Sequence, residues 1–161
     1  MSVYTLLVRH ETWATDRLIA FCEGLTPDQL ELKVPGTYGT IGATLQHLVG
    51  AKERYYQTLA KVAPDPDAIG DDDGVDLARL RRRSLALGEG LLRVADLDPD
   101  TVLERRRRDG TILTAKAGTI LGQLIHHGND HRTHIETTLS AHGITDGRPD
   151  LDVWSFVAAG G

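Results

Sequence analysis

The chain has 161 residues, enough to bury a hydrophobic core, and we expect residues 1–161 to form a single domain. Its 18 Lys and Arg against 23 Asp and Glu give a net charge of −5. This charge argues against a protein that coats nucleic acid, because a surface that binds phosphate groups is basic. One cysteine excludes an intramolecular disulfide, and neither a secretory signal nor a membrane-length apolar run is apparent. We therefore expect a cytoplasmic protein with no nucleic-acid or membrane partner.

Apolar residues at helical spacing predict four long helices. The first extends from about residue 3 to Gly24, and the second begins near Thr40 and keeps Leu59 on its apolar side. The third covers about 75–97 and ends at Asp98-Pro99-Asp100. The fourth begins between 116 and 119 and ends near His142-Gly143, where glycine supplies a common helix stop.

The connections between these helices carry turn residues. Thr26-Pro27-Asp28 predicts a turn or the cap of a short extra helical turn. Residues 64–74 predict an irregular acidic connection. Residues 101–115 contain Asp109-Gly110 between two β-prone runs, which predicts a small hairpin or an extended excursion. The tail, 149–161, is expected to pack back onto the helices.

Four amphipathic helices favour an all-α protein with the architecture of a four-helix bundle. The long connection after the second helix and the excursion after the third leave room for crossovers. The pattern alone therefore leaves the connectivity of the bundle open.

The fourth helix carries three histidines on or near its apolar side. At about 100° per residue, His131 lies roughly 40° from His127, and His134 lies roughly 20° to the other side. An unpaired polar group on a buried face is costly, so either other polar groups or a metal ion must satisfy these imidazoles. We predict a metal ion.

A metal site needs a ligand from another part of the fold, and His47 on the second helix is the best candidate. Three neutral imidazoles leave coordination positions for water or substrate, as catalytic sites do. His134 is a rival third or fourth ligand, and His126 is expected on the flank of the site. The competing interpretation is that these are ordinary histidines linked by hydrogen bonds.

Several other residues have a structural and a functional interpretation. Arg132 is interpreted as a solvated charge or as a residue that binds an anionic substrate, and Cys22 is interpreted as a small buried residue. Glu53 and Asp16 lie on helices where a general base is plausible. The arginine runs 81–83 and 105–108 are expected at the surface.

The segment His127-Gly128-Asn129-Asp130-His131-Arg132-Thr133-His134-Ile135 resembles the His-x-x-x-His-Arg-x-x-Ile pattern of the DinB/YfiT-like superfamily. Leu45-Gln46-His47-Leu48 resembles the segment with the first metal histidine of that family, and the tail 151–156 is similar to its closing segment. The resemblance implies an up-up-down-down four-helix bundle and a frequent homodimer. It also implies a divalent metal, zinc or nickel, on His47, His127 and His131. His134 stands where many relatives carry Gln.

The resemblance to this family also suggests an activity, because some members are thiol S-transferases or isomerases that use a low-molecular-weight thiol. A metal strips the proton from a bound thiol and leaves a nucleophilic thiolate, which suits transfer to an electrophilic small molecule. A metal-dependent hydrolase and a non-catalytic dimeric binding or stress-associated bundle are the alternatives.

Overall fold

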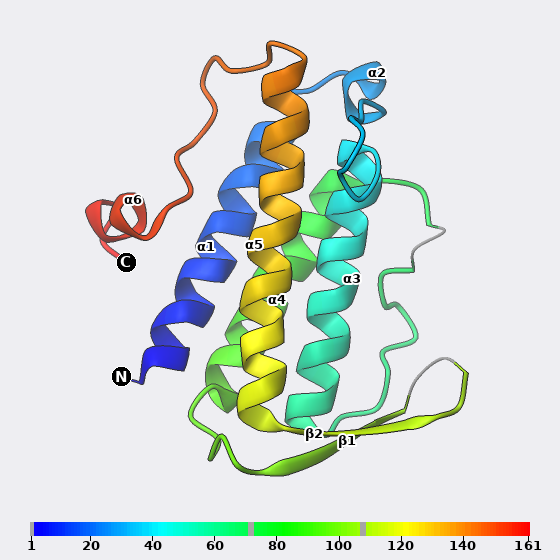
Figure 1. The fold of residues 1–161 in the computed structure, drawn as a ribbon, viewed down its shortest axis with the longest axis vertical. Coiled ribbons are helices and arrows are strands. Elements are labelled where there is room, and N and C mark those ends of the chain that lie inside the picture. The colour runs from blue at the N-terminus through cyan, green and yellow to red at the C-terminus, as the bar shows by residue number, and fades with distance from the viewer. Residues whose placement is uncertain (1, 71–72, 107–108) are drawn as a thin grey trace.

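A computed structural model of the chain describes residues 2–70, 73–106 and 109–161 (Figure 1). Its backbone is mostly helical, with one two-stranded antiparallel sheet. In chain order the elements are α1 Val3–Cys22, α2 Pro27–Leu30, α3 Ile41–Ala60, α4 Leu77–Val94, β1 Val102–Arg106, β2 Ile112–Lys116, α5 Ala117–Ala141 and α6 Val153–Ala158. The four predicted long helices, the hairpin and the extra turn at Thr26-Pro27 are thereby confirmed.

The four long helices pack as a bundle, and side-chain contacts show their directions. Lys52 and Tyr56 of α3 meet Ser84 and Gly90 of α4, so these two helices are parallel. In contrast, α1 is antiparallel to α4, since Thr5 bonds to Asp96 and Asp16 pairs with Arg81. The pairs Tyr4–Gly118 and Thr15–Arg132 make α1 parallel to α5.

The order along the chain is therefore up, down, down and up, and the up-up-down-down order implied by the family resemblance is wrong for these helices. The physical reason lies in the connections. The short segment with α2 reverses the chain between α1 and α3, whereas the longer connection after α3, of which residues 61–70 and 73–76 are described, returns along the bundle so that α4 starts at the same end as α3 (Figure 1).

Local sequence signals explain where these elements begin and turn. The side chains of Ser2, Thr40 and Asp76 accept hydrogen bonds from the first turns of α1, α3 and α4. Gly110 takes φ +84°, a conformation that L-residues rarely adopt, at the turn of the β1–β2 hairpin. Of the arginine run 105–108, residues 107 and 108 lie outside the described residues.

The core has two apolar clusters with a buried polar belt between them. Glu11 of α1, Lys52 of α3 and Arg132 of α5 are each at most 3% exposed. The Glu11 carboxylate lies 2.9 Å from Lys52 Nζ and 3.6 Å from Arg132 Nη1. Arg132 is therefore a buried partner of Glu11, and its interpretation as a solvated charge is wrong.

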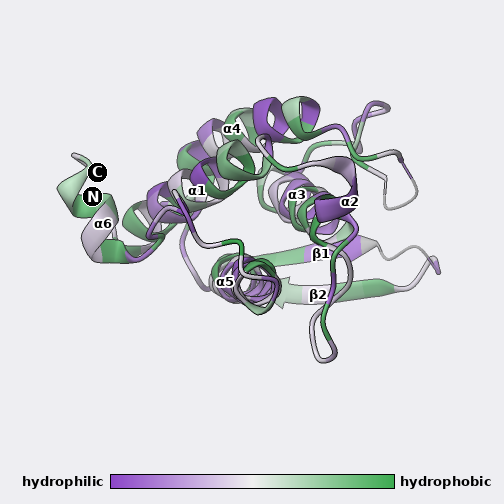
Figure 2. Cartoon of the chain, turned by 90° about the horizontal axis from the view of Figure 1, so that it is seen from above, coloured by the Kyte–Doolittle hydropathy of each residue, from purple (hydrophilic) through white to green (hydrophobic). Residues whose placement is uncertain are grey.

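The tail packs back onto the bundle as predicted. In Figures 1 and 2, α6 lies beyond α1, on the side away from α3. Phe156 is buried there against the rings of His10 and Trp13. Across the described ranges, none of the helices combines the length and apolarity that a membrane crossing requires.

Candidate metal centre

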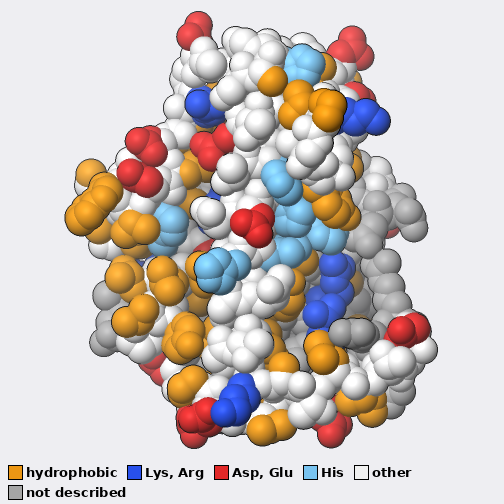
Figure 3. All heavy atoms as spheres, viewed as in Figure 1, with side chains coloured by type: hydrophobic (Ala, Val, Ile, Leu, Met, Phe, Trp, Pro, Cys, Tyr) orange, Lys and Arg blue, Asp and Glu red, His pale blue; other side chains and the backbone are white. Residues whose placement is uncertain are grey.

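His47, His127 and His131 lie together between α3 and α5, near the middle of the bundle. The Nε2 atom of His127 is 3.1 Å from Nε2 of His47 and 3.1 Å from Nε2 of His131. His47 and His127 are partly exposed, while His131 is buried. In Figure 3 histidine side chains gather on this face of the molecule, over α5 and α3. The structure thus brings together the three residues named from the sequence.

This geometry fits a metal ion. Nitrogen ligands at about 2.0–2.1 Å from one ion, with angles between the octahedral and tetrahedral values, lie about 2.8–3.4 Å apart. Two of the three separations, both 3.1 Å, fall within this range, and all three ligand atoms lie within 4.8 Å of one another. Imidazole nitrogen is a good ligand for zinc, nickel, copper and iron. The cluster could therefore hold a divalent metal ion with positions left for another ligand.

The protonation of the cluster also suits metal binding. Burial, followed by repulsion from the neighbouring histidines, lowers the pKa of His127 and of His131 from 6.5 to about 4. At neutral pH both imidazoles are uncharged, so each ring has a nitrogen lone pair. A cation therefore does not have to displace a proton from either ring before it binds.

Tyr38 contacts His47 at Nδ1, the ring nitrogen that does not face the other histidines. Its hydroxyl lies 2.9 Å from His47 Nδ1, and the two rings stack with centroids 4.2 Å apart. A hydrogen bond to the second ring nitrogen holds a histidine in one tautomer and one orientation. Tyr38 could not be identified from the sequence, because it lies in the irregular segment 35–39, where residue spacing carries no information about contacts.

The other histidines lie around the cluster. The ring of His134 is 5.6 Å from that of His131 between centroids, but His134 is not among the three residues whose ligand atoms converge. Its Nδ1 is buried without a hydrogen-bond partner in the described part of the chain. His126 is exposed on α5, as expected for a residue on the flank.

Neither carboxylate considered as a general base faces the histidines. Glu53 is 2% exposed, forms a salt bridge with Arg83 and accepts a hydrogen bond from the backbone N–H of Ile69. Asp16 pairs with Arg81 on the α1–α4 side of the bundle. Both groups have structural partners. Cys22, as expected, is a buried residue, and burial raises the pKa of its thiol to about 12.

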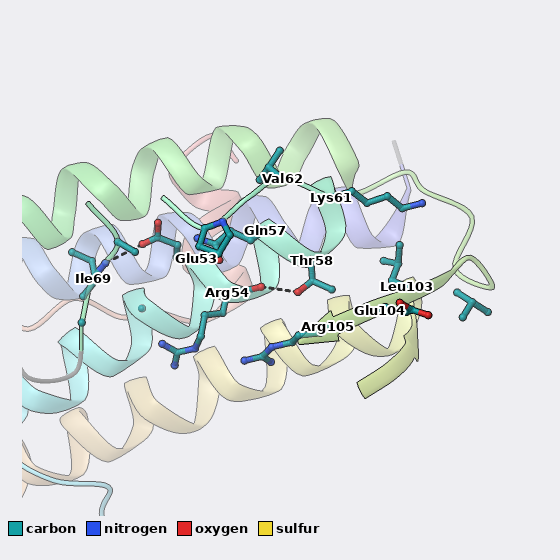
Figure 4. Close-up of a pocket in the computed structure, with 15 residues that line it drawn as sticks. Glu53, Arg54, Gln57, Thr58, Lys61, Val62, Ile69, Leu103, Glu104 and Arg105 are labelled. Carbon is teal, nitrogen blue, oxygen red and sulfur yellow. Dashed lines mark hydrogen bonds between the residues drawn. The ribbon is translucent and has the colours of Figure 1, made fainter. Parts of the chain in front are cut away.

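A groove of about 900 Å³ extends along α3 (Figure 4). Its walls come from α3, the connection after it and strand β1. Gly50, one turn after His47, lines the groove, and so do Arg54 and Arg105. In Figure 4 both guanidinium groups extend toward the side on which α5 lies. The three histidines are not among the residues that line this groove.

Comparison with known proteins places the chain in a family. The sequence model of the DinB family matches residues 1–156. A crystal structure of a DinB-like protein from Bacillus cereus ATCC 10987 superimposes with a TM-score of 0.64 at 18% identity, covering 88% of this chain and 91% of that one. No curated protein matches the chain. The structural likeness supports the fold, and the sequence match over nearly the whole chain shows that this protein belongs to the DinB family.

Proposed function

We propose that this protein is a divalent-metal-dependent enzyme that transfers a low-molecular-weight thiol to an electrophilic small molecule. In this proposal His47, His127 and His131 bind the metal, with zinc or nickel as the expected ion. The observation that carries the proposal is the convergence of three imidazole groups from two helices. Family membership is compatible with it.

A divalent ion at this site supplies one chemical effect, since it lowers the pKa of a coordinated thiol and so yields a thiolate at neutral pH. The chain's own residues prepare for this effect. Three neutral imidazoles add no negative charge, so they leave the charge of the cation available to the thiol. The hydrogen bond between His47 Nδ1 and the Tyr38 hydroxyl orients His47, and the groove along α3 offers room for the rest of the substrate.

In the transfer itself the thiol sulfur forms a bond to an electrophilic carbon of the second substrate. The thiol proton leaves to solvent, and the carbon releases its leaving group with the electron pair of the broken bond. Where the reaction is an addition, the π electron pair instead moves to the neighbouring atom of the multiple bond, and that atom takes up a proton from solvent. No oxidant or reductant is consumed. Sulfur needs no protein base for this step, which agrees with the engagement of Glu53 and Asp16 by arginines.

Two alternative functions differ from this proposal. One has a different ligand beside the three histidines, and the other has no catalytic activity. A metal-dependent hydrolase would use water whose pKa the metal has lowered to about 7. A non-catalytic bundle would retain the histidines for structure or binding alone. Homodimer formation and a cytoplasmic location stay predictions.

Thiol ligation is tested by loading the protein with Co²⁺ and adding 2-mercaptoethanol. A thiolate bound to cobalt produces a charge-transfer absorption band in the near ultraviolet. We expect this band in the wild type and in the His126→Ala control, whose altered side chain is exposed, but not in His47→Ala. Cobalt-loaded wild type that shows no band at saturating thiol would contradict the proposed thiol chemistry and favour the alternatives.

A further inference from the structure

His131 has one ring nitrogen inside the histidine cluster and one outside it. Its Nε2 lies 3.1 Å from Nε2 of His127, whereas its Nδ1 is buried and has no hydrogen-bond partner within the described residues. A neutral imidazole carries a proton on one ring nitrogen and a lone pair on the other. A metal ion on Nε2 therefore requires the proton to be on Nδ1. That N–H needs an acceptor, because an unpaired buried donor is costly.

His134 has a matching ring nitrogen. It follows His131 by three residues on α5, so the two side chains occupy neighbouring positions on one side of the helix. Their rings meet edge to face, with centroids 5.6 Å apart and an interplanar angle of 76°. The Nδ1 atom of His134 is also buried without a hydrogen-bond partner in the described part of the chain. One turn of α5 thus holds two buried imidazole nitrogens that each lack a partner.

The other rings around His131 have their polar atoms engaged in different contacts. The Nε2 atoms of His47 and His127 lie in the histidine cluster itself, 3.1 Å from each other. The ring of Tyr38 meets that of His131 with centroids 4.8 Å apart, but its hydroxyl lies 2.9 Å from His47 Nδ1. Among these neighbouring rings, His134 is therefore the one with a buried nitrogen left to accept a proton from His131.

We propose that His134 is a positioning residue of the metal centre, whose Nδ1 accepts a hydrogen bond from Nδ1–H of His131. The inference rests on the three-histidine site of the proposed function and names the group that orients one of its ligands. A small rotation of the His134 ring, or one water molecule that binds both nitrogens, completes the contact. His134 then carries its own proton on Nε2, and His131 keeps the Nε2 lone pair directed at the metal.

The first test needs no metal. Long-range ¹H–¹⁵N NMR of the metal-free protein, labelled with ¹⁵N-histidine and kept at neutral pH, identifies the tautomer of His131. We expect the Nδ1–H form in the wild type and a shift toward the Nε2–H form in His134→Phe, which keeps an aromatic ring but offers no acceptor. His126→Phe, at an exposed position of the same helix, should leave the tautomer unchanged. Wild-type His131 in the Nε2–H form would overturn the inference.

The second test measures zinc affinity by competition with a chromophoric chelator, with circular dichroism to establish folding. His134→Phe should bind zinc about tenfold more weakly, because loss of a hydrogen bond to a metal-bound histidine lowers metal affinity by about 10- to 100-fold. His134→Gln should stay close to the wild type, since its amide oxygen can accept the same proton. An unchanged affinity in folded His134→Phe would overturn the inference. So would an equal loss in His134→Gln, which is the result expected if His134 binds the metal directly.

The results of these tests separate the role of His134 from the proposed thiol transfer. The expected tautomer and zinc affinities, without a thiolate band in the cobalt-loaded wild type, would contradict the thiol chemistry and leave the role of His134 standing. A thiolate band together with equal zinc affinities of wild type and His134→Phe would overturn the role of His134 and leave the thiol chemistry standing. Wild type that binds no zinc would overturn both.

Discussion

Removing different charges of the buried polar belt, which consists of Glu11, Lys52 and Arg132, should lower the stability of the protein by different amounts. Glu11 faces two cations, Lys52 and Arg132, so Glu11→Gln leaves both buried without their carboxylate. Breaking a buried ion pair in this way costs about 3–5 kcal/mol. At about 2–4 °C per kcal/mol for a chain of this size, the melting temperature should fall by about 6–20 °C. Lys52→Met should cost less, because the remaining Glu11–Arg132 pair is balanced.

The pH dependence of this effect has a defined sign. Burial of Glu11 alone would raise its pKa, but the charges of Lys52 and Arg132 and hydrogen bonds from Lys52 and Thr15 outweigh burial and lower the pKa below its ordinary 4.5. A carboxyl whose pKa is lowered by folding stabilises the protein above the pKa of the unfolded state, and this contribution is lost as the pH falls through the folded-state pKa. The difference between wild type and Glu11→Gln should therefore be full at pH 7 and shrink below pH 4.5.

Thermal and urea denaturation of the metal-free protein at pH 7 and at decreasing pH measures both effects. Glu23→Gln, at the residue that follows α1, is the control, since Glu23 pairs with Arg81 at the surface and its loss should cost less than about 1 kcal/mol. Glu11→Gln within 1 kcal/mol of the wild type, or Lys52→Met at least as destabilising as Glu11→Gln, would refute the account of the belt.

Two further predictions concern packing and ligand orientation. A Cβ on Gly88 would lie 2.5 Å from Thr12 Oγ1, so Gly88→Ala should destabilise the protein by about 1–3 kcal/mol in urea denaturation, while Gly122→Ala, with open space around it, should stabilise it by about 0.5–1 kcal/mol. Equal effects of the two substitutions would argue against the close α1–α4 contact. Tyr38→Phe keeps the stacked ring but loses the hydrogen bond to His47 Nδ1, so metal affinity in competition with a chromophoric chelator should fall about tenfold; an unchanged affinity would exclude the orienting role.

The helices and the hairpin could be predicted because their signals are local. Apolar spacing, the caps and Asp109-Gly110 depend on neighbours within a few residues, and the observed bounds of α1 and α5 differ from the predicted ones by at most about two residues. The directions of the helices could not be predicted in this way. Periodicity identifies the buried side of a helix but not its direction, and the topology depends on the end of the bundle at which α4 begins after α3, which no local pattern encodes.

The site shows the same division between local and distant information. His127 and His131 share a helix face, and His47 lies near the apolar side of α3, so their proximity could be inferred from spacing and bundle packing. Tyr38 reaches the site from a loop, whose position depends on the whole fold. The burial of Arg132 could not be foreseen, because the carboxylate that compensates it comes from α1.

Metal content tests the central claim most directly. Tag-free wild type, His47→Ala, His131→Ala and the His126→Ala control are purified, incubated with zinc or nickel, desalted and analysed by elemental mass spectrometry, with circular dichroism to establish folding. The account predicts close to one metal ion per chain in the wild type and in His126→Ala, and loss of the metal in folded His47→Ala and His131→Ala. Wild type without bound metal, or full metal content in either of these two variants, would contradict it.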